Sequence, residues 1–501
     1  MKLIGVVASS SKTSVAPMLV FKDAEGFVKE EALVVVEDAK TKKKYLGVVR
    51  SLTKLDPLLT HTQRSAIIER PELADESLDL PYETNAIRII GELTEKRLEP
   101  PSIPPTPRSK VYLVESPADL ELNLGEGLKI GVHKYSGVEV SLLPEALRYH
   151  IAVVGTTGTG KSRLVKAVID EALEKTSWSI VVFDHTGVDY APYWPDNIVG
   201  GHEVALDIET ITTGLKLAVG AIENLIEEYV PIALAYYAMC ASRTGNAQKC
   251  VPRNIEAELA NASESLLEDA VIKVAEAKQW SAEDLARIAK GVAEHLGARP
   301  STLLKLNLYV RIYGEHFVKR LNSMRYRIDD LIAMAKEKRL VVIDLSTVET
   351  EIRRVIVKRV LERLWEIISE TLEPMNMLVV VDEAHNYACD RGCYPSNMLI
   401  EKTLREGRKW GVGVILASQR VIDFSPDVRN NVNTVFFSKL QTPYDFNQLQ
   451  GFVDLAGITA DTLALLEKRE FFFAGYGNPL KYPLLIKVRE VAEPRRVLGA
   501  Q

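Results

Sequence analysis

One segment of the chain has the residue types and spacing that phosphate binding requires. Its members are consecutive: Gly155, Thr156, Thr157, Gly158, Thr159, Gly160, Lys161 and Ser162. Glycines let successive backbone amides point at phosphate oxygens, and the lysine and serine that follow can contact the β- and γ-phosphates and Mg²⁺. A plain glycine turn is the alternative, but an apolar strand before the segment and a helix after it favour a phosphate-binding loop. We therefore predict that ATP binds here, with Ser162 as a ligand of Mg²⁺.

Two adjacent carboxylates, Asp382 and Glu383, follow the apolar run 377–381. A strand of a parallel sheet would deliver both to its carboxyl end, where Asp382 can hold a Mg²⁺-bound water and Glu383 can polarise the attacking water. The same pair would also suit a helix N-cap followed by a first-turn acid. The presence of the phosphate-binding loop favours the catalytic interpretation.

Three further polar residues lie near the end of the next predicted helix and strand. Gln419 follows the strand 413–417 and could sense the γ-phosphate or orient water, although a surface glutamine after a strand is common. Arg405 and Arg408 lie late in the preceding helix, where arginines ordinarily complement the helix dipole. In a ring of subunits, one of them could instead reach the γ-phosphate of a neighbour.

The four cysteines are Cys240, Cys250, Cys389 and Cys393, and none forms a Cys-x2-Cys pair. His385, Cys389 and Cys393 have helical spacing and suggest a metal site, but a fourth nearby ligand is missing. We favour cysteines that pack in a core or a loop. A disulfide within either pair is expected only in a protein from a hyperthermophile.

Composition limits the kind of protein that can carry these residues. The chain has 501 residues, 47% of them hydrophobic and 26% charged, which is typical of a globular protein of several domains. Its net charge of −6 excludes a chain-wide basic surface, so any DNA contact must be local. The longest apolar runs are far shorter than the roughly 18 to 20 residues that cross a bilayer, and we expect a cytoplasmic, nucleoid-associated protein with no membrane partner.

The elements that must position the candidate residues follow two patterns. Short β-rich runs separated by turns predict a small antiparallel barrel at the N-terminus, with strands at 3–8, 17–22, 32–37, 45–51, 86–91 and 110–115. Prolines make 99–107 a loop or linker. Strands and helices then alternate, which predicts a parallel sheet with helices on both faces. The strands are expected at 149–154, 179–183, 340–345, 377–381, 413–417 and 434–439.

The alternation stops between residues 207 and 327, where apolar residues repeat with helical spacing. More than a hundred residues without a strand exceed any ordinary crossover, so we predict an inserted helical bundle rather than extra core helices. The predicted segments are a barrel at 1–125, the first part of the ATPase core at 126–206, the insertion at 207–335, the second part of the core at 336–489 and a tail at 490–501.

The motifs together resemble the HerA/FtsK superfamily of ring translocases, and within it the archaeal HerA family. The resemblance is carried by Arg148-Tyr149-His150 leading into the glycine-rich loop, by Asp382-Glu383-Ala384-His385, by the REGRKWG segment from Arg405 and by Ala417-Ser418-Gln419-Arg420. It implies an α/β fold: a RecA-like P-loop NTPase core of the ASCE type with an N-terminal small β-barrel and an inserted helical bundle.

The resemblance also implies activity, partners and roles. It implies a homo-hexamer that hydrolyses ATP, encircles double-stranded DNA in its lumen and works with a NurA-like nuclease in DNA end resection. Lys161 and Ser162 would bind nucleotide, Glu383 would be the hydrolytic base and Gln419 the sensor. Arg408 would be the first choice for the finger that acts on a neighbour, with Arg405 second. Two more nucleotide contacts would come from Arg148 and from Asp184. Asp184 matches the acidic residue that opens a family motif, but this motif is longer in the present chain, which leaves the role of Asp189 open.

Other functions remain compatible with these motifs. A clamp or scaffold that ATP opens and closes would need the same hydrolytic residues, and so would a DNA-packaging type of pump without a membrane anchor. A protein-remodelling ATPase would respond to polypeptide and not to DNA. Removal of a roadblock from duplex DNA separates the translocase from the clamp.

Overall fold

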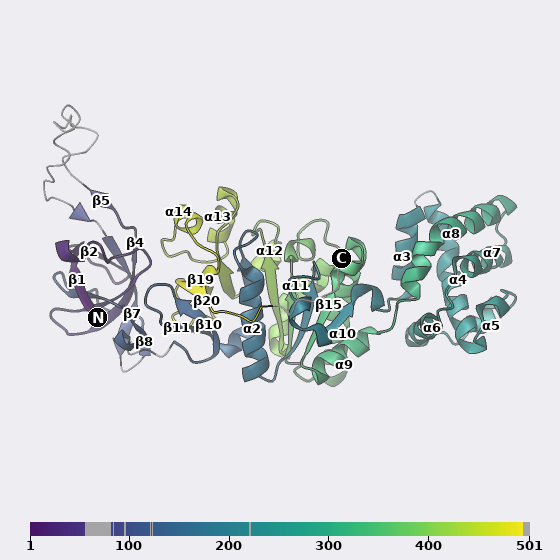
Figure 1. The fold of residues 1–501 in the computed structure, drawn as a ribbon, viewed down its shortest axis with the longest axis horizontal. Coiled ribbons are helices and arrows are strands. Elements are labelled where there is room, and N and C mark those ends of the chain that lie inside the picture. Colours follow the sequence, from purple (N-terminus) through teal and green to yellow (C-terminus); the bar gives the residue numbers. More distant parts are fainter. Residues whose placement is uncertain are drawn as a thin grey trace, which may run out of the picture. The chain divides into compact units, whose positions relative to one another are not determined.

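The computed structural model describes residues 1–55, 82–83, 85–94, 97–120, 122, 124–219 and 222–493 (Figure 1). These residues form two compact units. The first consists of Met1–Ser177, Ala417–Ile422 and Arg429–Val491, and the second consists mainly of Trp178–Leu416 and Asp423–Val428. Among the described helices, none combines the length and the apolarity that a membrane span requires.

The first unit begins with a closed antiparallel β-barrel. Its six strands pair in the order β2-β1-β9-β3-β4-β7, and β7 returns to β2 and closes the sheet. Alternate apolar side chains such as Val34, Val36 and Tyr45 fill the barrel core, as period-2 patterning requires. The predicted barrel is thus confirmed. The strands are β1 (Lys2–Val7), β2 (Val15–Val20), β3 (Leu33–Glu37), β4 (Lys44–Arg50), β7 (Asn85–Thr94) and β9 (Lys110–Leu113), with β8 (Arg97–Glu99) added beside β7.

A second sheet of the first unit carries the glycine-rich segment. Here β12 (Ile151–Val154) pairs in parallel with β18 (Thr434–Phe437), and antiparallel strands follow in the order β19 (Glu470–Gly475), β20 (Leu484–Val488), β10 (Leu128–His133) and β11 (Glu139–Leu142). Helix α2 (Lys161–Lys175) packs on β10, β12 and β20. The predicted strands β12 and β18 do pair in parallel, and the antiparallel strands β19, β20, β10 and β11 extend this part of the sheet. The links between β10 and β11 and between β19 and β20 are too short for a helical crossover, so these pairs are antiparallel.

The second unit contains five parallel strands in the order β17-β16-β13-β15-β14. They are β17 (Val412–Ser418), whose last two residues already belong to the first unit, β16 (Met377–Val381), β13 (Ser179–Asp184), β15 (Leu340–Asp344) and β14 (Ile198–Gly200). Their nearly continuous apolar sequences fit strands that are buried on both faces. The helices α9 (Ile328–Glu337), α10 (Thr350–Thr371) and α11 (Ser396–Glu406) belong to this α/β part, and α10 contacts both α9 and α11.

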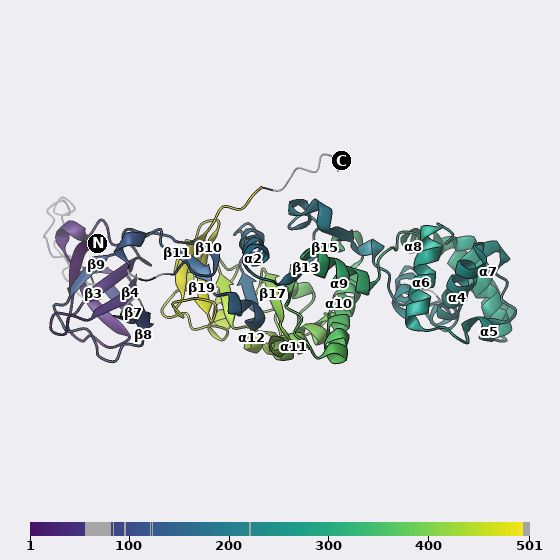
Figure 2. The same ribbon diagram turned by 90° about the horizontal axis from the view of Figure 1, so that it is seen from below.

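The helices α3 to α8, which follow β14 along the chain, gather as a bundle in both views (Figures 1 and 2). Ser281 is the N-cap of α7, and its Oγ accepts from the Asp284 amide at 3.1 Å. The reciprocal bond of a capping box is replaced, because the Ser281 amide donates to the Tyr237 hydroxyl at 3.1 Å. The helical segment predicted within 207–335 is therefore present. Its members are α3 (Ile208–Val219), α4 (Glu223–Thr244), α5 (Ile255–Leu259), α6 (Glu264–Glu276), α7 (Ala282–His295) and α8 (Pro300–Leu321).

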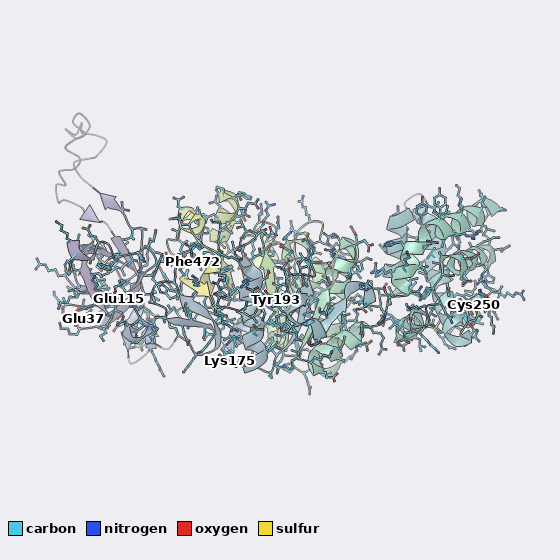
Figure 3. All side chains as sticks on the ribbon, in the orientation of Figure 1. Glu37, Glu115, Lys175, Tyr193, Cys250 and Phe472 are labelled. Carbon is cyan, nitrogen blue, oxygen red and sulfur yellow. A yellow bond between two sulfur atoms is a disulfide. The ribbon has the colours of Figure 1, made fainter. Side chains whose placement is uncertain are left out.

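The cysteines are paired, contrary to the expectation of free packing cysteines. Cys240 at the end of α4 bonds to Cys250, which Figure 3 labels in the helical insertion, and Cys389 bonds to Cys393. Residues 385–393 do not form one helix, and the turn brings the Cα atoms of the second pair to 5.5 Å, a distance that a disulfide spans. The suggested metal site at His385, Cys389 and Cys393 therefore lacks its thiolates.

The remaining short elements lie in the segments that link the strands named above. They are β5 (Lys54–Leu55), β6 (Tyr82–Glu83), α12 (Pro426–Asn431), α13 (Pro443–Gln450) and α14 (Ala460–Ala464). The predicted tail at 490–501 falls largely outside the described residues, which end at position 493.

Candidate nucleotide-binding site

The glycine-rich loop of the first unit joins β12 to α2 with two glycines in the left-handed region. Gly158 has φ +84° and Gly160 has φ +102°, conformations that a residue with a Cβ rarely adopts. A Cβ on Gly155 would lie 2.9 Å from the hydroxyl of Thr159. The loop therefore requires glycine at these positions for its shape, as a loop with inward-facing amides does.

Neighbouring strands hold the two sides of this loop within the first unit. The Gly155 amide donates to the Ser418 carbonyl at 3.2 Å, and the Thr156 amide donates to the Lys439 carbonyl at 2.9 Å. The Thr159 carbonyl accepts from the Arg469 amide at 2.7 Å. Contacts from three separate segments thus fix the loop that sequence spacing predicted.

Lys161 begins α2 and its side chain folds back over the loop. Only 8% of the residue is exposed, and its Nζ donates to the Gly155 carbonyl at 2.9 Å and to the Thr156 carbonyl at 3.4 Å. The first turn of α2 contains no acidic residue, and its amides carry the positive end of the helix dipole. The loop, the ammonium group and the helix N-terminus suit a polyanion such as the phosphates of ATP.

Gln419 lies beside this loop, as the sequence predicted. Its Oε1 accepts from the Thr157 hydroxyl at 3.0 Å, although 262 residues separate the two in sequence. Arg148, by contrast, is exposed near the end of the 3₁₀ helix Pro144–Tyr149. Gln419 is therefore in direct contact with the glycine-rich loop.

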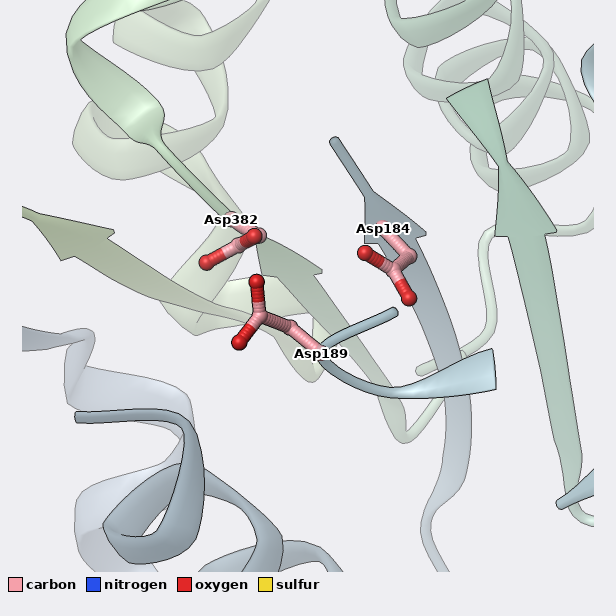
Figure 4. Close-up of side chains that lie close together, drawn as sticks. All are labelled: Asp184, Asp189 and Asp382. Carbon is pink, nitrogen blue, oxygen red and sulfur yellow. The ribbon is translucent and has the colours of Figure 1, made fainter. Parts of the chain in front are cut away.

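Three carboxylates gather in the second unit (Figure 4). Asp184 ends β13, Asp382 follows β16, and Asp189 lies in the loop after β13. One oxygen from each lies within 4.8 Å of the others. The sequence predicted Asp184 and Asp382 as site residues, and the shared end of two neighbouring parallel strands explains their closeness.

Asp184 is fully buried and its oxygens are occupied by the loop that follows it. Oδ1 accepts from the amides of Thr186 and Gly187 at 3.2 and 2.9 Å, and Oδ2 accepts from the amides of Tyr190 and Ala191 at 2.8 and 2.9 Å. Burial raises the pKa of this carboxyl, while the backbone amides lower it. Asp184 therefore organises the loop that carries Asp189.

Asp382 is 3% exposed, and its Oδ2 is buried with no hydrogen-bond partner among the described residues. Burial raises the pKa of Asp382 well above the ordinary value, and the charges of Asp189, Glu383 and Asp184 raise it further. A buried anion beside other anions is unfavourable unless a cation or a proton compensates it. The group is therefore suited to hold a metal ion.

Glu383, the predicted hydrolytic base, has the backbone conformation of a sharp turn. Its φ of +43° and ψ of +49° are left-handed, which is uncommon for a residue with a side chain. His385 Nδ1 lies 3.3 Å from Glu383 Oε2.

The sequence did not identify a polar network beside these carboxylates. His185 Nδ1 lies 2.8 Å from the Tyr387 hydroxyl, and Arg353 of α10 donates to the His185 carbonyl at 3.3 Å. Burial and the Arg353 charge lower the pKa of His185. His185 follows Asp184 directly, which was a possible signal, but the sequence pattern of α10 does not distinguish Arg353 from its other arginines.

The two candidate fingers lie on the surface of the second unit. Arg405 in α11 is half-exposed and forms an ion pair with Asp427 at 3.3 Å, and Arg408 is exposed in the 3₁₀ helix Gly407–Trp410. Exposure at the surface is what a contact with another subunit requires.

These features define the class of the protein. A strand, a lysine-containing glycine loop and a helix, together with a parallel sheet whose strand ends carry buried acids, constitute the P-loop NTPase fold. Residues 128–364 match the family model described as Helicase HerA, central domain. The central part of the chain is therefore similar to the HerA helicase family.

Similarity to named relatives extends over most of the chain. It is 22% identical over 505 residues to the DNA double-strand break repair helicase HerA of Pyrococcus furiosus, covering 91% of this chain and 86% of the relative. It is 25% identical over 458 residues to the protein of the same name from Sulfolobus acidocaldarius, covering 89% and 86%. Both sources are archaea.

Solved structures give weaker similarities. VirB4 of Thermoanaerobacter pseudethanolicus has a TM-score of 0.46 and 16% identity, covering 73% of this chain and 97% of that chain. The plasmid coupling protein TrwB in complex with ADP and Mg²⁺ has a TM-score of 0.44 and 15% identity, covering 74% and 92%.

Proposed function

We propose that this protein is a ring-forming ATPase that moves along double-stranded DNA. The observation that carries the proposal is the phosphate loop, with two left-handed glycines, a buried Lys161 and Gln419 bonded to Thr157. Similarity to the HerA family model and to relatives named DNA double-strand break repair helicases supports DNA as the substrate. We assign ATP turnover to residues 126–206 and 336–489. We assign no part in ATP turnover to the barrel, the insertion or the tail.

The roles of the individual residues follow from their chemistry. The loop amides and Lys161 bind the phosphates, and Ser162 is a ligand of Mg²⁺. Glu383 polarises the attacking water, and Gln419 detects the γ-phosphate and transmits its loss through Thr157. Asp184 contributes to the nucleotide site indirectly, by shaping the loop that follows it.

The residues present fit Mg²⁺. Hydroxyl and carboxylate oxygens are its preferred ligands, and the buried Asp382 Oδ2 lacks a hydrogen bond in the described part of the chain. We assign Ser162 and Asp382 to this ion. When bound, Mg²⁺ neutralises the charge that develops on the phosphate oxygens.

A homo-hexameric ring would let an arginine of one subunit contact the nucleotide of its neighbour, a contact that a single chain cannot provide. Arg408 is our first choice for the residue that reaches the γ-phosphate of a neighbouring subunit, with Arg405 second. Arg148 is exposed and is assigned to the nucleotide at the same interface. Such a contact contributes roughly 10³- to 10⁵-fold in rate in other nucleotidases.

The chain as a whole carries a net charge of −6, so it has no general positive surface for DNA. Contact with the DNA backbone would therefore need positive side chains concentrated in the lumen of the ring. Symmetry repeats each lysine or arginine once per subunit, so a few per chain suffice. We further propose that a NurA-like nuclease cooperates with the ring in DNA end resection.

Roadblock displacement tests the proposal directly. Linear duplex DNA carries a tightly bound protein block, and release of the block is measured with ATP and with a non-hydrolysable analogue. We expect ATP-dependent release by the wild type and none by Lys161→Ala. ATP hydrolysis without release would identify a clamp, and stimulation by unfolded polypeptide in place of DNA would identify a remodelling ATPase.

A further inference from the structure

The carboxylates of Asp184, Asp189 and Asp382 in the second unit have an arrangement that suits a cation site of its own, beyond an aid to nucleotide binding. We propose that Asp189 and Asp382 bind a divalent cation directly and do so before nucleotide arrives. Asp184 positions Asp189 for this contact. The sequence left Asp189 without a role, and the structure places it beside Asp382, the acid that follows β16.

The geometry of the oxygens fits one ion. Oxygen ligands lie roughly 2.0 to 2.6 Å from Mg²⁺ or Ca²⁺, so two ligands of the same ion are at most about 5 Å apart. One oxygen from each of Asp184, Asp189 and Asp382 falls within 4.8 Å of the others. Figure 4 shows the carboxylate of Asp189 turned toward that of Asp382.

The burial of Asp382 points to a ligand at this position. The residue is 3% exposed, and its Oδ2 has no hydrogen-bond partner among the described residues. Buried carboxylates are ordinarily paired, hydrogen-bonded or bound to metal. Asp184 and Asp189 add negative charge nearby, so a cation satisfies an oxygen that the surrounding side chains leave unsatisfied.

Asp184 is a positioning residue and not a ligand. Its two oxygens already accept from four backbone amides, those of Thr186, Gly187, Tyr190 and Ala191, which occupy the lone pairs that a cation would need. These bonds fold the loop after β13 back on itself and return Asp189 toward the end of β16. The Thr186 hydroxyl also donates to Asp189 Oδ2 at 2.8 Å, which restricts the direction of that carboxylate.

A shared proton is the competing explanation for two carboxylates this close. A proton between Asp189 and Asp382 would remove the repulsion without any metal. The two explanations differ in what the protein takes up at neutral pH, because only the cation site binds a divalent ion in stoichiometric amount.

The inference rests on the proposed function only where it assigns the ion to ATP hydrolysis. Binding of the ion itself is measured without nucleotide, and also in Lys161→Ala, which removes nucleotide binding but leaves the second unit unchanged. Failure of the ATPase assay and failure of the cation site are therefore distinguishable.

The experiment is a Mn²⁺ titration of the nucleotide-free full-length protein, followed by electron paramagnetic resonance of the free ion. We expect one Mn²⁺ per chain in the wild type and in Lys161→Ala, and affinity weaker by about tenfold or more in Asp189→Asn. Asp196→Asn, which changes an exposed aspartate, is the matched control and should bind as the wild type does. Circular dichroism verifies that Asp189→Asn is folded.

Two results would overturn the inference. One is the absence of Mn²⁺ binding until ATP is added, which would leave only the metal that nucleotide brings with it. The other is equal affinity in folded Asp189→Asn and the wild type, which would exclude Asp189 as a ligand and favour the shared proton.

Discussion

At the scale of single residues, the least ordinary backbone in the site belongs to Glu383. A residue with a side chain in the left-handed region costs of order 1 to 3 kcal/mol, and surrounding structure must compensate this cost. Here the buried strand β16 precedes Glu383, and the Asn386 amide donates to the Glu383 carbonyl at 2.9 Å. The conformation therefore serves the direction of the carboxylate, which is the property that a general base requires.

Glu383→Gln should retain ATP binding and reduce hydrolysis by roughly 10²-fold or more, because the amide keeps the shape of the side chain and loses the base. ATP turnover and binding of a fluorescent ATP analogue measure the two properties separately. Glu406→Gln, at an exposed position in α11, is the matched control and should hydrolyse ATP at the wild-type rate. Wild-type turnover in Glu383→Gln would remove this residue from the reaction.

The raised pKa of Asp382 predicts how stability depends on pH in the absence of divalent ions. A carboxyl whose pKa is higher in the folded state stabilises the fold below its unfolded pKa, and that contribution is lost as pH rises through the folded pKa. Asp382→Asn should therefore be more stable than the wild type at pH 8 with EDTA, and the difference should shrink as pH falls toward about 4. Urea unfolding at several pH values measures this, and a gap that does not change with pH would contradict it.

The chemistry that sequence could predict at this scale was local. Lys161, Ser162, Asp382 and Glu383 belong to short motifs whose neighbours in sequence supply the strand or loop that positions them. Asp189 and Arg353 could not be predicted in the same way. Asp189 reaches the cluster through the four amide bonds of Asp184, and Arg353 reaches His185 from a helix 168 residues later.

At the scale of elements, short β-rich runs separated by turn-forming residues predicted the six barrel strands. The strands of the α/β part were predicted from apolar runs, which do not reveal direction. Two short strands were expected within 470–488, where β19 and β20 lie, but the antiparallel pairing of β19, β20, β10 and β11 was not predicted, although the short connections within these pairs exclude helical crossovers. The disulfides were only an alternative in the sequence analysis, because cysteine spacing does not show that Cys240 and Cys250 lie at a Cα separation of 5.9 Å.

A buried histidine of the first unit predicts how the stability of the fold responds to acid. His133 of β10 is buried, with Nε2 3.0 Å from the Glu31 carbonyl and Nδ1 2.8 Å from the Ser136 hydroxyl. Burial lowers the pKa of His133 from 6.5 to about 4. Since the folded pKa is depressed, stability is complete above about pH 6.5 and is lost as pH falls through 4, by roughly 3 kcal/mol.

His133→Gln should therefore lose less unfolding free energy than the wild type between pH 7 and pH 4, although it is less stable at pH 7. His316→Gln, at an exposed position in α8, should follow the wild type across this range. Urea unfolding monitored by fluorescence gives the comparison. Parallel pH profiles of the wild type and His133→Gln would show that the buried imidazole does not control acid sensitivity.

At the scale of the whole molecule, the proposed ring predicts that two defective subunits can complement each other. Arg408→Ala subunits keep their own base, and Glu383→Gln subunits keep the finger, so a mixed ring contains interfaces with both groups intact. ATP turnover of mixtures should exceed the sum of the separate variants and peak at intermediate ratios. Mixtures of Glu383→Gln with Lys409→Ala, the neighbouring exposed lysine, give the reference curve for subunits with an intact finger.

Absence of complementation at every mixing ratio would contradict a finger at Arg408. Complementation by Arg405→Ala alone would contradict our order of preference for these two arginines, since it would show that Arg405 leaves its Asp427 partner to act on a neighbouring subunit.

The central claim is that ATP hydrolysis by a multi-subunit ring is coupled to duplex DNA. The most direct test is the rate of ATP hydrolysis with and without long linear duplex DNA, with particle mass determined by light scattering on the same sample. We predict a particle several times the 55.8 kDa mass of one chain and a rate that duplex DNA increases. A protein that stays monomeric, or whose rate of hydrolysis is unchanged by DNA, would contradict the account.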